Sequence, residues 1–341
     1  MRGIPVVAAL AALLAAPGSG QGIVVKLGTR APDGSTWHLL LKEMAEKWRE
    51  ASGGQVTLRI YPSGVAGDEP DMVRAMRIGR LHASALSVVG MSLITPEPQA
   101  LSAPLLIRDN HELDYVRDRL APAIEAKLKE KGFVVLNWGD AGWVQFFTTR
   151  EAATPEALRG LKLFVWTGDP ATLDIWKDLG FKPVPLSSTD ILPSLQTGLI
   201  EAVPTTPLIA ESAQLFGVAR HMTRVNWSPL VGCTLVSQSK WEEIPGELRP
   251  KLLALAREIG ERLKSEVRKL EGASIEAMRK RGLAVHEVDE KGRAEWRALA
   301  ERGYPRVRGE VVPAATFDQV KALAEERRAA TKAALEKPAT P

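Results

Sequence analysis

The order of hydrophobic and polar positions in the first third of the chain predicts alternating strands and helices. Apolar runs at 23–28, 56–61 and 83–89 have the length of strands, and residues 36–53 repeat Trp, Leu and Met at helical spacing. A second helical segment, 69–78, precedes the third run. Because this strand–helix order is typical of a parallel sheet with right-handed crossovers, we expect an α/β fold.

The segment 160–170 differs from these amphipathic elements because nearly every residue of its strand, 162–166, is apolar. A strand that is apolar on both faces is typical of a parallel sheet covered on both sides. Such sheets bind ligands beyond the carboxyl ends of their strands. We therefore expect Phe164 and Trp166, with Asp169 in the Gly-Asp-Pro turn that follows, to line a ligand site.

The same alternation continues toward the C-terminus. Six further runs are predicted strands, at 133–138, 144–149, 181–186, 200–203, 231–237 and 284–288. We interpret 144–149 as the first strand of a second domain and 231–237 as a return to the first. Residues 241–280 are mostly helical by periodicity, with Pro245 as the expected start, and a helix of this length is predicted to bridge both domains.

A length of 341 residues with 45% hydrophobic content favours a globular chain of two domains. We expect lobe I to comprise 23–143 and 229–270, and lobe II to comprise 144–228 and 271–335. The last six residues, 336–341, are predicted to be a disordered tail.

The first 22 residues have the pattern of a secretory signal peptide. Arg2 gives a positive start, an apolar run from Ile4 to Ala16 is too short to span a bilayer, and small residues follow at 17–20. We expect cleavage near Gln21 and a mature protein in the periplasm. The single cysteine, Cys233, lies in an apolar strand, so we interpret it as a small buried hydrophobic residue.

Charge and motif content exclude several classes of function. The 45 Lys+Arg and 41 Asp+Glu are interleaved, without a basic stripe that alternates with aromatic residues, so nucleic acid is not an expected partner. Nucleophile-elbow, zinc-protease, Cys-x-x-Cys and phosphate-loop motifs are missing from the sequence. We therefore predict that the protein is not an enzyme and has neither a cofactor nor a metal. The pair Asp68-Glu69 is interpreted as a helix N-terminus rather than an acid–base pair.

Nine tryptophans stand beside only three tyrosines, and several of the tryptophans fall near predicted strand ends. We expect an aromatic-walled pocket with polar groups that orient a small organic solute, apolar, amphipathic or cationic. Asp169 could balance a cation, but capping the helix that begins at Pro170 is the favoured interpretation. The predicted ligand-binding residues are Trp37, Ser87, Trp143, Gln145, Phe164, Trp166, Asp169, Ser188, Thr205, Thr206 and Trp227.

Five phrases occur in an order that resembles one known family. They are Tyr-Pro-Ser-Gly at 61–64 with Gly-Asp-Glu at 67–69, the run 76–83, the run 158–162, the run 195–202, and Ser-Lys-Trp at 239–241 with Ile-Pro at 244–245. Together they resemble the DctP-like solute-binding proteins of tripartite ATP-independent periplasmic (TRAP) transporters over nearly the whole mature chain. The resemblance implies a two-lobed periplasmic-binding-protein-like fold of mostly parallel sheets, a long helix spanning both lobes, closure on a solute, and membrane permease subunits as partners.

The sequence departs from that family at the solute site. The resemblance implies an arginine that binds a substrate carboxylate after Gly-Leu-Lys, but Phe164 stands there, and a second family arginine is replaced near Val144 and Gln145. A buried carboxylate without a cation is costly, so we expect a solute that is not held by an arginine clamp. Two alternatives stay open, a carrier or sensor on the same fold and a secreted enzyme with an unrecognised site.

Overall fold

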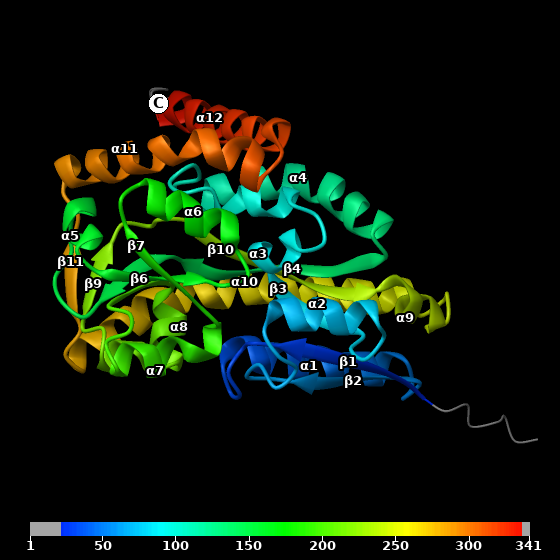
Figure 1. Cartoon of the computed structure of the whole chain (residues 1–341). Helices are drawn as coiled ribbons and strands as arrows, with labels where there is room; N and C mark the ends of the chain where they lie inside the picture. The colour runs from blue at the N-terminus through cyan, green and yellow to red at the C-terminus, as the bar shows by residue number, and fades with distance from the viewer. Residues whose placement is uncertain (1–21, 336–341) are drawn as a thin grey trace, which may run out of the picture.

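The computed structural model describes residues 22–335, which form two lobes, each built on one β-sheet (Figure 1). The strands of the first sheet are β1 (Ile23–Thr29), β2 (Val56–Tyr61), β3 (Ala83–Ser87), β4 (Phe133–Trp143) and β10 (Pro229–Ser237). Their spatial order is β2-β1-β3-β10-β4, with β1 parallel to both neighbours and β10 antiparallel to both. The predicted return of the chain to the first sheet at β10 is confirmed.

The second sheet has the order β11-β9-β5-β8-β6-β7. Its strands are β5 (Gln145–Thr148), β6 (Lys162–Trp166), β7 (Lys182–Leu186), β8 (Ala202–Thr205), β9 (His221–Arg224) and β11 (Ala284–Glu287). β6 is parallel to β7 and β8, as its apolar pattern predicted, whereas β5 is antiparallel to β8 and β9. Five of the nine strand pairings within 22–335 are parallel, so both sheets are mixed.

Helices cover both sheets. The longer ones are α1 (Thr36–Ala51), α2 (Glu69–Arg77), α4 (Asn110–Glu130), α6 (Pro170–Asp178), α10 (Arg249–Lys280), α11 (Glu290–Arg306) and α12 (Ala314–Leu335). Shorter turns of helix are α3 (Val88–Ser92), η1 (Glu97–Ser102), α5 (Pro155–Arg159), η2 (Ser188–Asp190), α7 (Ile191–Gln196), α8 (Pro207–Ser212), η3 (Leu215–Gly217), α9 (Gln238–Glu243) and η4 (Val307–Val311). None of the helices described here combines the length and apolar character needed to span a bilayer.

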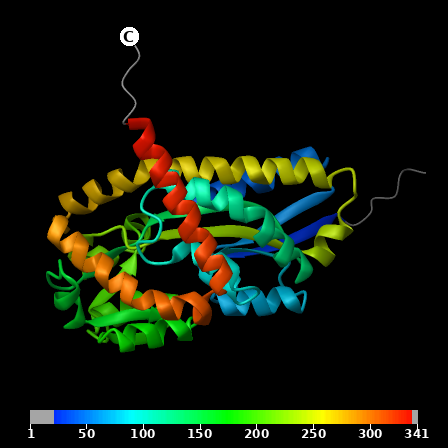
Figure 2. The same ribbon diagram turned by 90° about the horizontal axis from the view of Figure 1, so that it is seen from above.

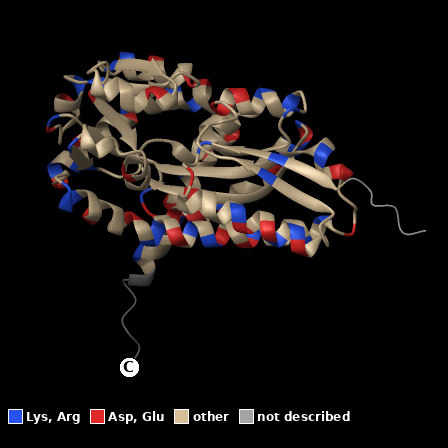
Figure 3. Ribbon diagram, turned by 90° about the horizontal axis from the view of Figure 1, so that it is seen from below, with Lys and Arg blue, Asp and Glu red and all other residues tan. Residues whose placement is uncertain are grey.

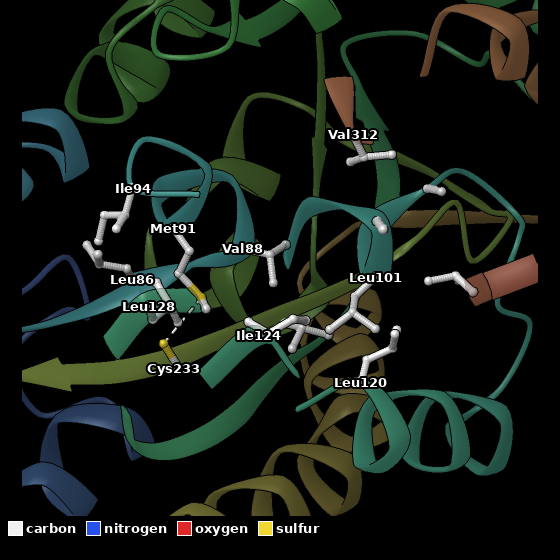
Figure 4. Close-up of a cluster of buried hydrophobic side chains, with 14 of the residues drawn as sticks. Leu86, Val88, Met91, Ile94, Leu101, Leu120, Ile124, Leu128, Cys233 and Val312 are labelled. Atoms are coloured by element: carbon white, nitrogen blue, oxygen red, sulfur yellow. Dashed lines mark hydrogen bonds between the residues drawn. The ribbon is translucent and has the colours of Figure 1, made fainter. Parts of the chain in front are cut away.

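The core of the first lobe lies on both faces of its sheet. Ser35 caps α1 by accepting a hydrogen bond from His38 N–H, and α1 buries its apolar stripe on one face. On the other face α4 contributes Leu120, Ile124 and Leu128, four residues apart, to the cluster in Figure 4. In that cluster Cys233 Sγ lies 3.2 Å from Met91 Sδ, and burial raises the pKa of the Cys233 thiol. The prediction of a buried, unreactive cysteine agrees with this setting.

The predicted long helix is present as α10, which packs on β4 of the first sheet and on α8 of the second lobe (Figures 1 and 2). Its expected start at Pro245 is wrong, because the helical region is broken into α9 and α10. Pro245 and Gly246 interrupt the helix, and α10 begins at Arg249 with Pro250 in its first turn, where a proline is tolerated. Acidic and basic residues alternate along its outer face in Figure 3.

The two C-terminal helices lie on different lobes. α11 packs on α5, and Trp296 Nε1 donates to the Ala153 carbonyl, which belongs to the second lobe. α12 crosses α4 of the first lobe in Figure 2 and buries Phe317, Val320 and Ala324 in the first-lobe core. The range 271–335, expected to belong to lobe II, therefore includes a helix that packs on the first lobe, because the apolar residues of α12 are buried in that lobe's core.

Candidate functional site

Two sheet edges face each other where the lobes meet. β1 and β3 are parallel to each other and end at Thr29 and Ser87, while β6 and β7 are parallel and end at Trp166 and Leu186. Arg30, which follows β1, contacts Trp166 at the end of β6, and Ser187 and Ser188, which follow β7, bind Asp68 of the segment between β2 and α2. Ligands of open α/β sheets bind at such carboxyl edges, so this is the candidate solute site.

We call this region the inter-lobe junction. It is made by Arg30, Asp68, Glu69 and Ser87 of the first lobe and by Trp166, Ser187 and Ser188 of the second. Of these seven residues the sequence predicted Ser87, Trp166 and Ser188. The structure brings those three together, although they lie up to about a hundred positions apart in the chain.

The first-lobe side of the junction is organised by a buried carboxylate. Glu69 is 2% exposed, binds Arg30 Nη2 at 2.6 Å through Oε1, and accepts hydrogen bonds from Ser87 N at 3.1 Å and Ser87 Oγ at 2.8 Å. Ser87 Oγ in turn accepts from Gly90 N and caps α3. A Cβ on Gly90 would overlap the Glu69 carboxylate, so the glycine is needed for this close packing.

Asp68 joins the two lobes. Its Oδ1 accepts from Glu69 N at 2.8 Å and caps α2, while Oδ2 accepts from Trp166 Nε1 at 2.8 Å and from Ser188 N and Oγ at 3.1 and 3.0 Å. Ser187 Oγ is a further donor at 3.2 Å. Burial by itself would raise the pKa of Asp68, but Arg30 and these hydrogen bonds outweigh it and hold that pKa below its ordinary value. The carboxylate is therefore ionised at neutral pH.

Trp166 contacts the first lobe with both its ring and its nitrogen. The Arg30 guanidinium carbon lies 6.0 Å from the ring centroid, within the range of a cation–π interaction. The ring also covers Gly168, where any Cβ would overlap it. An aromatic wall at the carboxyl end of β6 was predicted, but the cation that approaches it, Arg30, was not.

A second group of predicted residues surrounds the strands that pass between the lobes. Trp37 Nε1 donates to the Asp140 carbonyl at 3.2 Å, and Trp143 Nε1 donates to Asn110 Oδ1 at 3.0 Å. Burial raises the pKa of Glu271 on α10, whose Oε1 accepts from Trp143 N at 3.4 Å. These tryptophans anchor the end of β4 at the crossing.

Three more predicted residues at the same crossing stabilise the backbone around them, namely Gln145, Thr205 and Thr206. Gln145 is 1% exposed, and its side chain binds Asn226 Oδ1 and the N–H groups of Val225 and Asn226. Thr205 lies opposite Gln145 in the β5–β8 pair, and Thr206 caps α8 by accepting from Ile209 N. Their direct contact with a solute stays a prediction.

Three other predicted site residues also have partners, two of them in the cores of the second lobe and one in both lobes. Phe164 is 8% exposed and belongs to a core cluster of the second lobe, and Trp227 stacks on Trp176 at 5.5 Å in another. Asp169 caps α6, which confirms the favoured interpretation, and also accepts a hydrogen bond across the lobes from Gln99 Nε2 of η1 at 2.9 Å. A pocket role for Phe164 and Trp227 stays a prediction, but truncating either residue would leave a cavity in the core.

The sequence interpretation missed Arg30, Asp68, Glu69 and Ser187 as junction residues. Arg30 directly follows β1, and Ser187 directly follows β7, so both stand at the carboxyl end of a predicted strand, the position that pointed to Trp166. Asp68 and Glu69 were assigned only to the N-terminus of a helix, and the structure confirms that role. The sequence pattern did not show that these side chains also bind residues far away in the chain, Asp68 with Trp166 and Glu69 with Ser87.

Other candidate chemistry lies away from the junction or is lacking in the described chain. A hollow of about 590 Å³ on the outside of the first lobe is lined by α4 and α10 residues such as Asp114, Lys264 and Arg268, which form ion pairs there. Among residues 22–335, no group of three or more His, Cys, Asp or Glu side chains is arranged to hold a metal ion.

Comparison with known proteins identifies related chains of nearly equal length. A family model described as bacterial extracellular solute-binding protein, family 7, matches residues 27–309. A solute-binding protein of Chromohalobacter salexigens is 26% identical over 266 residues, or 76% of either chain, and the 2,3-diketo-L-gulonate-binding periplasmic protein of Escherichia coli is 23% identical over 265 residues, covering 76% of this chain and 80% of that protein.

One solved structure has a closely similar fold. It is a TRAP periplasmic solute-binding protein from Ralstonia eutropha with bound (S)-2-acetolactate, with a TM-score of 0.83 at 21% identity. The match covers 89% of this chain and 99% of that chain. This similarity shows that the two-lobed fold is shared.

Proposed function

Because the chain belongs to the family of bacterial extracellular solute-binding proteins, family 7, we propose that it is the exported receptor of a TRAP transporter. In this role it captures a small organic solute between its two lobes and delivers it to membrane permease subunits. Binding energy must favour the closed arrangement of the lobes over the open one, because only that difference can drive closure.

The observation that carries this proposal is the inter-lobe junction. The carboxyl ends of β6 and β7 meet the first lobe there, and the hydrogen bonds across the junction join the Asp68 side chain to three side-chain groups and one backbone N–H of the second lobe. Such contacts can open without breaking a sheet. The backbone connections between β4 and β5 and between β9 and β10, together with α10, keep the lobes attached.

Export is proposed from the N-terminal sequence, which lies outside the described residues. The positive start, the short apolar run and the small residues at 17–20 are the three parts of a secretory signal. A receptor that meets its solute outside the cytoplasmic membrane requires such a signal. N-terminal sequencing of the exported protein should find a new terminus near Gln21.

We propose a solute that is held by aromatic contact and hydrogen bonds rather than by an arginine–carboxylate pair. Phe164 replaces the arginine that the family resemblance implies, and Arg30, whose guanidinium lies over Trp166, is bound to Glu69 and lies 3.6 Å from Asp68. Two carboxylates beside one guanidinium leave this group formally negative. A neutral or cationic organic molecule fits that balance better than an anion.

The test is to identify what the protein carries. The exported protein is purified without denaturation, unfolded, and the released small molecules are determined by mass spectrometry. The solute found is then titrated into stripped protein by calorimetry, with Trp166→Ala as the site variant and Trp241→Phe, in the core beneath α1, as the control. We expect Trp166→Ala to weaken binding at least tenfold and Trp241→Phe to leave it nearly unchanged. An anion bound with equal affinity by both variants would contradict the proposed solute class, and an absence of any solute binding would contradict the receptor role.

A further inference from the structure

We propose that Asp68 is a built-in latch that holds the two lobes together and selects against carboxylate solutes. The proposal rests on the receptor function above, and it assigns to one carboxylate of the protein the position that an anionic solute would otherwise take. Four donors of the second lobe converge on Asp68 Oδ2, namely Trp166 Nε1, Ser187 Oγ, Ser188 N and Ser188 Oγ, at 2.8–3.2 Å.

The donor set has the composition of an anion site. A backbone N–H, two hydroxyls and an indole N–H are all neutral donors, and together they stabilise one negative oxygen. They lie at the end of β6 and directly after the end of β7, at the carboxyl edge where such sheets bind ligands. In most anion sites the ligand supplies the negative oxygen, whereas here the opposite lobe supplies it.

The two oxygens of Asp68 have separate tasks. Oδ1 accepts from Glu69 N and caps α2 within the first lobe. The four hydrogen bonds that Asp68 accepts from the second lobe all go to Oδ2. Only 10% of the side chain is exposed, so water cannot readily replace the second-lobe donors. Arg30, at 3.6 Å from Oδ1, compensates the charge in both the open and the closed arrangement because it belongs to the same lobe.

Two consequences follow for the receptor. First, the closed arrangement is populated without solute, because the latch needs nothing from outside the chain. Second, a solute carboxylate can reach these donors only by displacing Asp68, and it would meet the negative charge of Asp68 and Glu69 while doing so. A neutral or cationic solute does not compete for the donors and leaves the latch intact.

The test uses full-length mature protein stripped of solute, with spin labels at two exposed positions, Ile78→Cys on the first lobe and Leu199→Cys on the second. Distances are measured by double electron–electron resonance. The key variant is Asp68→Ser, because serine is also a good helix N-cap but is too short to cross the junction. The matched control is Asp109→Ser, since Asp109 is also a helix N-cap of the same lobe, accepting from Glu112 N–H at the start of α4.

We expect one short distance in the parent and in Asp68→Ser a longer distance, with the closed-to-open ratio lowered at least tenfold, the usual effect of losing a charged hydrogen bond. Asp109→Ser should keep the parent distance. Ser188→Ala should shift the distribution in the same direction as Asp68→Ser by removing one donor from the other side.

Added acetate should restore the short distance of Asp68→Ser in a saturable way, because its carboxylate can occupy the vacated donors, whereas acetamide, which is neutral and of similar size, should not. An unchanged distance in Asp68→Ser, or equal effects of acetate and acetamide, would overturn the latch. Because these measurements contain no transported solute, they can contradict the latch without contradicting the receptor function. A failure to find any bound solute would contradict the receptor function without contradicting the latch.

Discussion

At the scale of single residues, an ionic network fixes the first lobe next to the crossing strands. Asp140 is 5% exposed and binds Arg117 Nη1 at 3.0 Å and Arg268 Nη2 at 2.6 Å. Asp114 binds Arg268 Nη1 at 2.7 Å and also contacts Arg117. Burial alone would raise the pKa of Asp114, but Arg268 and Arg117 outweigh it and lower that pKa to about 2. The network ties α4 and α10 to β4.

This network predicts a pH dependence of stability. A carboxylate with a folded pKa of about 2 and an unfolded pKa of about 4 stabilises the fold fully above about pH 4, and the contribution is lost as the pH falls toward 2. We expect Asp114→Asn to be less stable than the parent at pH 7 in urea unfolding, with the difference shrinking between pH 4 and pH 2.5. A difference that stays constant over this range would show that Asp114 acts by packing and not by charge.

At the scale of elements, α10 determines how the first sheet meets the second lobe. Gly260 lets the helix approach β4, because a Cβ there would lie 2.6 Å from the Trp138 carbonyl oxygen and 2.8 Å from Asn137 Cβ. Asn137 Nδ2 also donates to the Ala256 carbonyl of the helix at 3.0 Å. Gly272 lies farther along the same helix, and nothing is within 4 Å of its Cβ position.

The two glycines of α10 should respond to alanine in opposite ways. Alanine favours an exposed helix position over glycine by about 1 kcal/mol, so Gly272→Ala should raise the free energy of unfolding by roughly 0.5–1 kcal/mol. Gly260→Ala should lower it by about 1–3 kcal/mol, because a backbone carbonyl cannot move aside as a side chain can. Urea unfolding of the two variants measures both values. Stabilisation by Gly260→Ala would mean that α10 does not rest on β4 as closely as described.

At the scale of the whole molecule, the lobes are joined by more than the strand crossings. α11 contributes Trp296 to the core of the second lobe, and α12, next along the chain, contributes Phe317 to the core of the first. Arg328 of α12 forms a bidentate ion pair with Glu112 of α4, with N–O distances of 2.8 and 2.9 Å, and the Glu112 side chain is 6% exposed. The C-terminal helices therefore form a strap from one lobe to the other.

Breaking the ion pair of this strap should weaken the docking of α12. Arg328→Met leaves the Glu112 carboxylate without its cation, and we expect a loss of about 2–3 kcal/mol in urea unfolding, below the ~3–5 kcal/mol of a fully buried pair because Arg328 is partly exposed. Limited trypsin digestion should then cut within α12 before the rest of the chain. The comparison is Arg308→Met, whose partner Asp318 is half exposed, so that its loss should change the free energy of unfolding much less than the loss of Arg328. Equal effects of the two substitutions would exclude a special role for the strap.

Much of the fold was predictable because local patterns determine local structure. The apolar run 162–166 indicated a strand covered on both faces, and β6 buries the consecutive residues Leu163, Phe164 and Val165 between β7 and β8. The apolar positions of α1 indicated its buried face. The strand β9, which lies between β11 and β5, was not predicted, since its four residues, His-Met-Thr-Arg, alternate too briefly to stand out. The start of α10 was also misplaced, because helical periodicity continues across Pro245.

The candidate site was only partly predictable, for a different reason. The sequence by itself determined the order of elements, the family and the strand ends at which a solute would meet the protein, because each depends on residues close together in the chain. Which side chains meet at those ends was decided by the tertiary structure. Asp68 and Trp166 are 98 positions apart, and nothing in the sequence around either residue indicates that they form a hydrogen bond. A hydrogen bond between two lobes depends on the relative position and orientation of their sheets, and no local sequence pattern encodes that arrangement.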